Sequence, residues 1–238
     1  TRGLYTIYIN QDYARIRGIE LEYKTRIGKI FRATLSGSYS IATGKSSAAN
    51  ENVYNIQQGV EENLKENYVV WDRPWQASAN LNFNVPKNDP LFAFGRGILD
   101  DYNIYLRLFF QSGKRYTPQK FYRYNPTTGR PEYQSDRTKL YREIGSNWFY
   151  TDLNFEKYLS FDFIKLVLSL EIQNVFNNKN SQIINPITGT AYEYGQVTPT
   201  DWNDPLYPDL TAPLDPFPYN PARYLNPRTF KLGLSLRF

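Results

Sequence analysis

The stretch TFKLGLSLRF, residues 229–238, alternates between two kinds of side chain along its whole length. Successive residues of a β-strand point to opposite faces, so a strand with this sequence has one apolar and one polar face. A half-buried strand of a soluble sheet shows the same alternation, and the surroundings of the strand therefore have to be inferred from the rest of the chain. The apolar positions are Phe230, Leu232, Leu234, Leu236 and Phe238.

The composition excludes a membrane-spanning helix but is compatible with strands that cross a membrane. The chain has 238 residues and a mean hydropathy of −0.60. It contains no run of the roughly 18 apolar residues that a membrane helix needs. A transmembrane strand is apolar on one face only, so a barrel of such strands has a polar average. The opening TRGLYTIYIN lacks the charged and apolar regions of a signal peptide, and we therefore expect a mature or partial chain.

The chain contains no His and no Cys, which restricts the chemistry it could perform. Ser-His-Asp and Cys-His catalysis are excluded, as are metal sites built on imidazole or thiolate ligands. No motif indicates carboxylate or lysine catalysis, so we expect no enzymatic activity, no cofactor and no metal. The net charge of +5 is too small to indicate a nucleic-acid partner.

Six further stretches repeat the alternation, and a weaker one opens the chain at residues 4–10. Soluble strands usually have ~5–6 residues, whereas tilted membrane strands need ~9–11. The length of most stretches therefore favours an all-β fold, a transmembrane antiparallel β-barrel with about eight strands in this chain. A soluble lipocalin-like barrel would reverse the two faces and rarely places so many charges inside. The six stretches are residues 18–27, 31–41, 75–85, 103–111, 149–158 and 164–173.

The expected connections alternate in length. Outer-membrane barrels have short turns on the periplasmic side and long loops outside the cell. We therefore expect the long segments outside, with an aromatic girdle near them formed by Tyr39, Trp71, Trp75 and Tyr224. The short turns are residues 28–29 and 160–162, residues 86–101 are intermediate, and the long segments are residues 44–67, 114–147 and 178–222.

Three stretches resemble the last strands of TonB-dependent receptor barrels, outer-membrane transporters of the kind common in Bacteroidetes. They are ENYVVWDRPWQASANLNF (66–83), SLEIQNVFNNKN (169–180) and YLNPRTFKLGLSLRF (224–238). YARIRGIELEY (13–23) and FFQSGKRYTP (109–118) are also similar to recurring segments of that family. The final apolar face with its terminal Phe238 resembles the C-terminal signal that the barrel assembly machinery reads.

The resemblance implies energised uptake, in which extracellular loops bind a ligand and TonB drives the rearrangement of a plug domain. Members have about 22 strands, so residues 1–238 are expected to be the C-terminal portion of such a barrel, with the plug and earlier strands upstream. The implied partners are outer-membrane lipid and lipopolysaccharide, the barrel assembly machinery, TonB through the plug, and an unidentified ligand. The alternative is a complete eight-stranded barrel with a structural or adhesive role.

The charged residues of the polar faces are predicted to face the lumen, because a charge on the lipid face of a barrel is costly. In a receptor they contact the plug or water, and in a small barrel they form an ion-paired interior. They are Glu20, Glu22, Lys24, Arg26, Arg32, Arg107, Asp152, Glu156, Lys165 and Glu171.

The long segments differ in charge. Residues 114–147 carry a net charge of +5, whereas residues 178–222 and 44–67 carry −4 and −2. These charges either pair within a folded cap, or bind an anionic or aromatic ligand such as a ferric siderophore, or contact lipopolysaccharide. Arg offers bidentate hydrogen bonds and Tyr a rigid amphipathic surface. The candidate ligand residues are Tyr116, Tyr122, Arg123, Tyr124, Arg130 and Tyr133.

Overall fold

The computed structural model describes residues 13–46, 66–90, 99–161, 163–191, 193 and 224–237, with only the backbone of Arg237. The described chain is mostly antiparallel β-sheet, and it holds no helix long and apolar enough to cross a membrane. The main sheet has eight strands. They are β1 (Ala14–Ile27), β2 (Phe31–Gly44), β3 (Asn67–Tyr68), β4 (Trp75–Val85), β5 (Tyr102–Gln111), β10 (Trp148–Ser160), β11 (Lys165–Gln173) and β12 (Thr229–Arg237).

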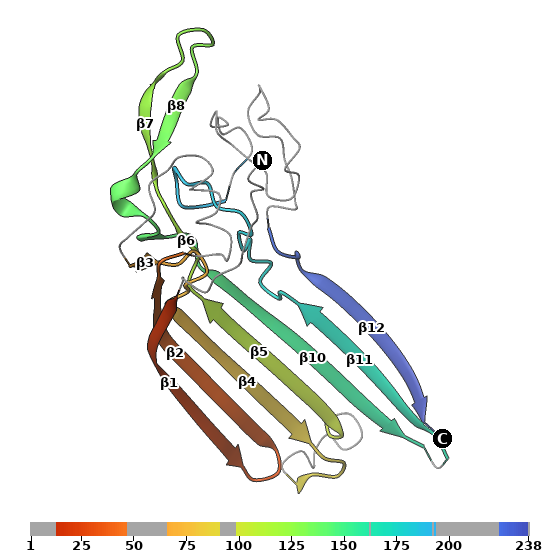
Figure 1. The fold of residues 1–238 in the computed structure, drawn as a ribbon. Coiled ribbons are helices and arrows are strands. Elements are labelled where there is room, and N and C mark those ends of the chain that lie inside the picture. The colour runs from red at the N-terminus through yellow and green to blue at the C-terminus, as the bar shows by residue number, and fades with distance from the viewer. Residues whose placement is uncertain are drawn as a thin grey trace, which may run out of the picture.

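Seven of these strands form an antiparallel meander (Figure 1). Their order is β1-β2-β4-β5-β10-β11-β12, and the two-residue β3 pairs with the end of β2. β1 and β12 are the two edges, and neither pairs on its outer side with another described residue. The described strands therefore form an open sheet, and no closed barrel is detected among them.

The strand register separates apolar from polar side chains. Directly opposed residues of neighbouring antiparallel strands point to the same face of a sheet. Leu168 of β11 lies opposite Leu234 of β12, and Leu106 of β5 lies between Leu81 and Leu153. Following such pairs across the seven strands gives one continuous face dominated by apolar side chains, which we call the apolar face. Ser, Asn, Gln and most charged side chains lie on the opposite, polar face.

The apolar face is not covered by the described part of the chain. Leu21 on β1 is 74% exposed, and Leu232 on β12 is 84% exposed. Large aliphatic side chains thus lie on the outside, whereas soluble proteins rarely expose apolar patches larger than a few hundred Å². Among the described residues, the buried hydrophobic side chains are all small ones, namely Ala33, Ala42, Val69, Val85, Val167 and Ala191.

Long and short connections lie at opposite ends of the sheet, as the sequence predicts. The β2–β4, β5–β10 and β11–β12 connections are at one end, which we call the upper rim (top of Figure 1). The tight β1–β2 turn at the other end contains Gly28 at φ +57°, a backbone conformation that glycine adopts without steric cost.

The β5–β10 connection, residues 112–147, has structure of its own, and we call it the outer segment. β6 (Arg115–Tyr116) pairs with β9 (Glu143–Ile144) as a short ribbon at the upper rim. Beyond this ribbon, β7 (Gln119–Tyr124) and β8 (Pro131–Ser135) form a hairpin that projects away from the main sheet (Figure 1). The short 3-10 helix η2 (Arg137–Lys139) leads back from the hairpin to β9.

The expected long strands are found where the alternation predicts them, with changes at their ends. β1 begins at Ala14 and β2 runs to Gly44, so both extend further toward the upper rim than predicted. The outer segment was expected to be a loop, and its four short strands correct that expectation. These strands are too short to produce a long alternation in the sequence. The weak strand expected at residues 4–10 lies outside the described residues.

Candidate functional site

All ten residues predicted to face a lumen belong to the polar face of the sheet. Their ladder partners are Ser, Thr, Asn and other polar residues on the same face. They are Glu20, Glu22, Lys24 and Arg26 on β1, Arg32 on β2, Arg107 on β5, Asp152 and Glu156 on β10, and Lys165 and Glu171 on β11.

Some of these charges are paired with one another or with a neighbouring strand. Lys24 Nζ lies 2.8 Å from the Glu22 carboxylate, and Lys231 of β12 lies 3.2 Å from the Glu171 carboxylate. Both pairs are largely exposed to solvent, so they contribute little to stability. The ring of Tyr158 lies 4.6 Å from Lys165 Nζ, and its hydroxyl donates to Glu156 at 2.5 Å.

Arg107 lies within the polar face and contacts aromatic rings. Its guanidinium carbon is 6.0 Å from the ring centroid of Phe109 and 5.8 Å from that of Tyr150, and these two rings stack at 4.9 Å. Asp152 lies directly opposite Arg107 in the ladder, but its carboxylate accepts a hydrogen bond from the Asn174 N–H at 3.0 Å. The Arg107 guanidinium is therefore held beside rings, and no described carboxylate forms an ion pair with it.

Two hollows on the polar side of the sheet meet at Arg107 and Phe109. One, of about 810 Å³, lies over β1, β2, β4 and β5. The other, of about 480 Å³, lies between β5, β10 and the residues that flank β11 and β12. Hydroxyl, amide and aromatic groups dominate both linings, so a polar ligand could find hydrogen-bonding partners there. Tyr224, expected in the aromatic girdle, instead lines the second hollow together with Gln111, Trp148 and Gln173.

Five of the six candidate ligand residues lie on the β7–β8 hairpin. Arg123 donates to the Glu132 carboxylate at 2.6 Å, which raises the pKa of Arg123 and lowers that of Glu132. Arg130 lies in the turn, where its carbonyl accepts a hydrogen bond from Asn125 N–H at 2.7 Å. To bind an anionic ligand, Arg123 would have to leave its partner on the same hairpin.

A β-bulge at Tyr122 divides the aromatic side chains of the hairpin between two sides. Phe121 opposes Tyr133 and the pairing resumes at Arg123, so Tyr122 is the extra residue. Phe121 packs against Tyr124 at 5.0 Å and Tyr133 at 6.2 Å between ring centroids, while the Arg123 guanidinium lies 5.3 Å from the Tyr122 ring. The hairpin therefore displays an exposed aromatic cluster on one side and a cation with a ring on the other.

Tyr116, the sixth candidate, lies apart from these residues at the base of the outer segment. A Cβ added at Gly189 would come within 2.6 Å of the Tyr116 hydroxyl, so that hydroxyl is packed against the backbone of the β11–β12 connection. Burial raises the pKa of Tyr116, and the carboxylate of Glu143 adds to this shift. Tyr116 is thus part of the packing at the upper rim.

Asp136 fixes the return from the hairpin. Its carboxylate lies 2.6 Å from Lys120 Nζ and accepts the Thr138 N–H at 3.1 Å, capping η2. The hydrogen bonds from Lys120 and then from Thr138 lower the pKa of Asp136 to about 2. Glu132, Asp136 and Glu143 are thus each paired with a basic residue of the outer segment itself.

The apolar face carries most of the residues expected in an assembly signal, and Tyr39 and Trp75 of the expected aromatic girdle. Tyr39 and Trp75 pack at 4.5 Å near the upper rim, and Trp71 is exposed there. On β12 the exposed apolar residues are Phe230, Leu232, Leu234 and Leu236, whereas Phe238 lies outside the described residues.

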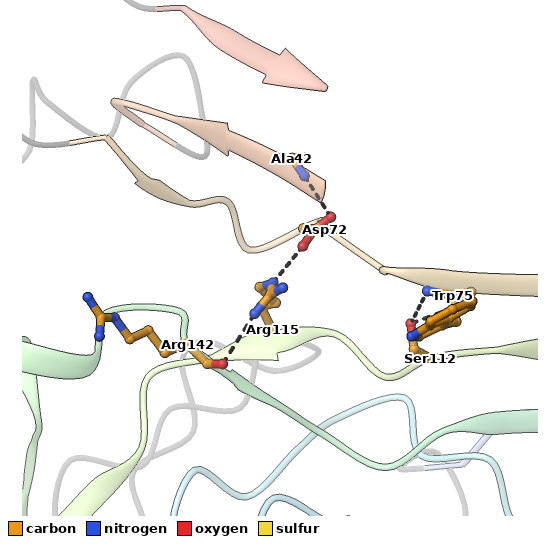
Figure 2. Close-up of polar contacts among 6 residues, drawn as sticks. All are labelled: Ala42, Asp72, Trp75, Ser112, Arg115 and Arg142. Atoms are coloured by element: carbon orange, nitrogen blue, oxygen red, sulfur yellow. Dashed lines mark hydrogen bonds and ion pairs between the residues drawn. The ribbon is translucent and has the colours of Figure 1, made fainter. Parts of the chain in front are cut away.

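Sequence reasoning missed a buried polar cluster at the upper rim (Figure 2). The Asp72 carboxylate accepts hydrogen bonds from Ala42 N–H at 3.0 Å and from Arg115 Nε at 2.5 Å. Arg115 also donates to the Arg142 carbonyl at 3.2 Å, and its guanidinium lies 3.6 Å from the ring centroid of Tyr68. The side chains of Asp72 and Arg115 are only 1% and 7% exposed, so this ion pair is shielded from water.

A second set of contacts lies beside this pair. Arg73 donates to the Ser112 carbonyl at 3.1 Å and lies 4.0 Å from the Trp148 ring, and burial lowers the pKa of Arg73. The Ser112 hydroxyl accepts the Trp75 N–H at 2.9 Å. The available sequence signal was the placement of Asp72 and Arg73 between two Trp residues in WDRPW (71–75). Their partners lie roughly 40 residues away and have no local signature.

No protein-family model, curated protein or solved structure matches this chain. In the described part of the chain, no group of three or more His, Cys, Asp or Glu side chains is arranged to hold a metal ion.

Proposed function

We propose that this chain forms part of the wall of an outer-membrane β-barrel of the TonB-dependent receptor type. The observation that carries the proposal is the apolar face, which runs across seven strands and exposes large aliphatic side chains. Exposing such a face to water costs about 25 cal/mol per Å². Lipid tails remove that cost, and the polar face then lines the interior, where charges are tolerated.

The dimensions and edges of the sheet support a barrel wall. The seven long strands have 9 to 14 residues, which fits the ~9–11 that a tilted strand needs to span a bilayer. A sheet edge cannot remain unpaired in lipid, so the outer sides of β1 and β12 call for further strands. The alternative, a complete eight-stranded barrel with a structural or adhesive role, has less support because β1 and β12 do not pair with each other.

In this proposal the upper rim faces the outside of the cell and takes part in ligand capture. The outer segment carries a net charge of +5, and its hairpin exposes Phe121, Tyr122 and Tyr124. An anionic or aromatic ligand would meet these groups first and the hollows around Arg107 next. Movement through the barrel would be driven by TonB acting on a plug, and lipopolysaccharide would contact the outer surface of the rim.

Alternating labelling of β11 and β12 tests the membrane placement. Single Cys variants at Leu168, Ser169, Leu234 and Ser235 are made in the full-length protein, labelled with a fluorophore and reconstituted in bilayers. We expect lipid-attached quenchers to quench the probes at Leu168 and Leu234, and aqueous iodide to quench those at Ser169 and Ser235. Equal quenching by both agents at all four positions would contradict a membrane wall.

A genetic comparison tests the uptake role separately. If the protein is an energised receptor, loss of TonB should reproduce the growth phenotype caused by deleting the protein. An adhesive or structural barrel would keep its function without TonB. The two experiments can fail independently, since a barrel can span the membrane without being a transporter.

A further inference from the structure

We propose that Asp72 and Arg115 are positioning residues that lock the outer segment to the upper rim and so set the direction of the β7–β8 hairpin. The two residues come from different connections, because Asp72 lies between β3 and β4 whereas Arg115 is the first residue of β6. The β4–β5 ladder ends at Gln76 and Gln111, and the ion pair joins the two connections just beyond that end, where no described strand pairing joins them. The role in ligand capture rests on the proposed function, but the mechanical coupling does not.

The outer segment enters and leaves the sheet through a narrow stem, which consists of the Gly113–Gly145 crossing and the β6–β9 ribbon. Gly113 and Gly145 cross so closely that a Cβ at Gly113 would lie 2.1 Å from the Gly145 carbonyl oxygen. Directly beyond this crossing, β6 and β9 pair over only two residues. A two-residue ribbon on a glycine crossing resists bending poorly, so the direction of the hairpin depends on further contacts around the ribbon. These include the backbone hydrogen bond from Gln119 N–H to the Pro186 carbonyl at 3.0 Å, together with side-chain contacts.

The Asp72–Arg115 pair has the geometry for that task. Arg115 is held at four points, by the Asp72 carboxylate, by the Arg142 carbonyl, by the face of the Tyr68 ring and by its own place in β6. Asp72 is held in turn by Ala42 N–H at the end of β2. The planar guanidinium can satisfy a carboxylate, a carbonyl and a ring in one orientation only, which a Lys ammonium on a flexible stem cannot reproduce.

Burial makes the separation of this ion pair costly. An exposed ion pair exchanges freely with water, whereas a buried charge that loses its partner is left without solvation. Asp72 and Arg115 are both almost fully shielded. The pair is thus made or broken as a unit, and while it is made the stem and the end of β2 move together. In the proposed receptor this would present the exposed aromatic residues of the hairpin at a constant angle above the hollows.

The test measures the direction of the hairpin by pulsed electron paramagnetic resonance. This chain has no Cys, so spin labels are introduced by Thr127→Cys in the hairpin turn and Glu20→Cys on β1 of the full-length protein. Both positions are exposed. We expect a single narrow distance distribution in the parent and a distribution at least twice as wide after Arg115→Gln. Arg115→Lys, which keeps the charge, should give an intermediate width.

Two further variants keep the outcome decisive. The double variant Asp72→Asn with Arg115→Gln removes both buried charges, so it tests the coupling even where a single variant does not fold. Glu171→Gln with Lys231→Gln removes the exposed pair between β11 and β12 and should leave the distribution unchanged. An unchanged width in the double variant, or equal broadening in the control, would overturn the proposal. Neither result depends on whether the protein takes up a ligand.

Discussion

The main sheet and the upper rim follow opposite rules of burial. In the sheet, large apolar side chains such as Leu21 and Leu232 are exposed. At the upper rim, polar side chains are buried among the connections. Eight of the nine buried polar residues that the structure describes lie at this rim or in the strand ends next to it, and the exception is Asp100 at the opposite end. These eight are Asp72, Ser112, Arg115, Thr151, Asn174, Asn180, Ser181 and Asn185.

This difference reflects what stabilises each region. The sheet is held by continuous backbone ladders and, in our proposal, by lipid on its apolar face. The rim has few buried apolar residues, so specific hydrogen bonds and ion pairs must fix its shape. Buried polar groups contribute little net stability when paired but are costly when a partner is removed. We therefore expect a substitution at the rim to destabilise the protein by removing a hydrogen-bond or ion-pair partner. A substitution in the sheet should destabilise it by placing a polar or charged side chain on the apolar face.

The largest effect is expected from Arg115→Leu, which leaves the shielded Asp72 carboxylate without its cation. Removing one partner of a buried pair costs about 3–5 kcal/mol. The cost should appear as local opening of the rim, measured as faster hydrogen exchange of the Ala42 amide. Exchange in β11 should not change. Lys231→Leu, at an exposed pair, is the control and should change the free energy of unfolding very little.

The sheet is tested by placing Arg on each of its faces. Leu234→Arg should destabilise the protein in bilayers by about 2–4 kcal/mol, because in our proposal its charge enters the lipid near mid-strand. Ser235→Arg, one residue further on the polar face, should cost much less. Denaturant titration of the reconstituted protein measures both. Equal costs for the two substitutions would show that the faces are assigned wrongly.

Asn174 lies where the sheet and the rim meet, and Asn174→Ala tests their junction. Its side chain donates to the carbonyls of Asn178 and Asn226 and accepts Asn178 N–H, while its own φ is +51°. Alanine loses these hydrogen bonds and disfavours that backbone conformation, so we expect a loss of about 1–3 kcal/mol. Asn174→Gly removes only the hydrogen bonds. If the Asn174→Gly variant were as stable to denaturant as the parent, backbone strain alone would account for the loss of stability in Asn174→Ala.

The smallest effect is expected when the pH is lowered enough to protonate the Asp136 carboxylate. Its pKa is lowered from the usual 3.8 to about 2, so the folded state favours the ionised carboxylate. The stabilisation is fully present above about pH 4 and is lost as the pH falls through about 2. Hydrogen exchange of the Thr138 amide, corrected for its intrinsic pH dependence, should show local opening over that range. Asp136→Asn should abolish the pH dependence, and an unchanged profile would exclude this carboxylate as its source.

The sequence was sufficient to predict the strands and their two faces. An alternation of period two is a local property, since each residue of a strand points away from its neighbours whatever lies beyond. The register confirms that Leu168 and Leu234 share one face, and that Glu22 and Arg107 share the other. The ends of the strands were predicted less well because Ala14 and Gly44 continue the ladder without continuing the alternation.

The tertiary structure decided which charges are paired and what the outer segment becomes. The sequence shows eight basic residues among residues 114–147, but not that Arg123 meets Glu132 or that Arg115 meets Asp72 in a distant connection. The first pair depends on the register of the β7–β8 hairpin, and the second on how the β4–β5 pairing brings two connections together at the rim. Alternating side chains thus determine a two-faced sheet from the sequence alone, whereas the buried polar contacts exist only once the meander has placed three long connections side by side.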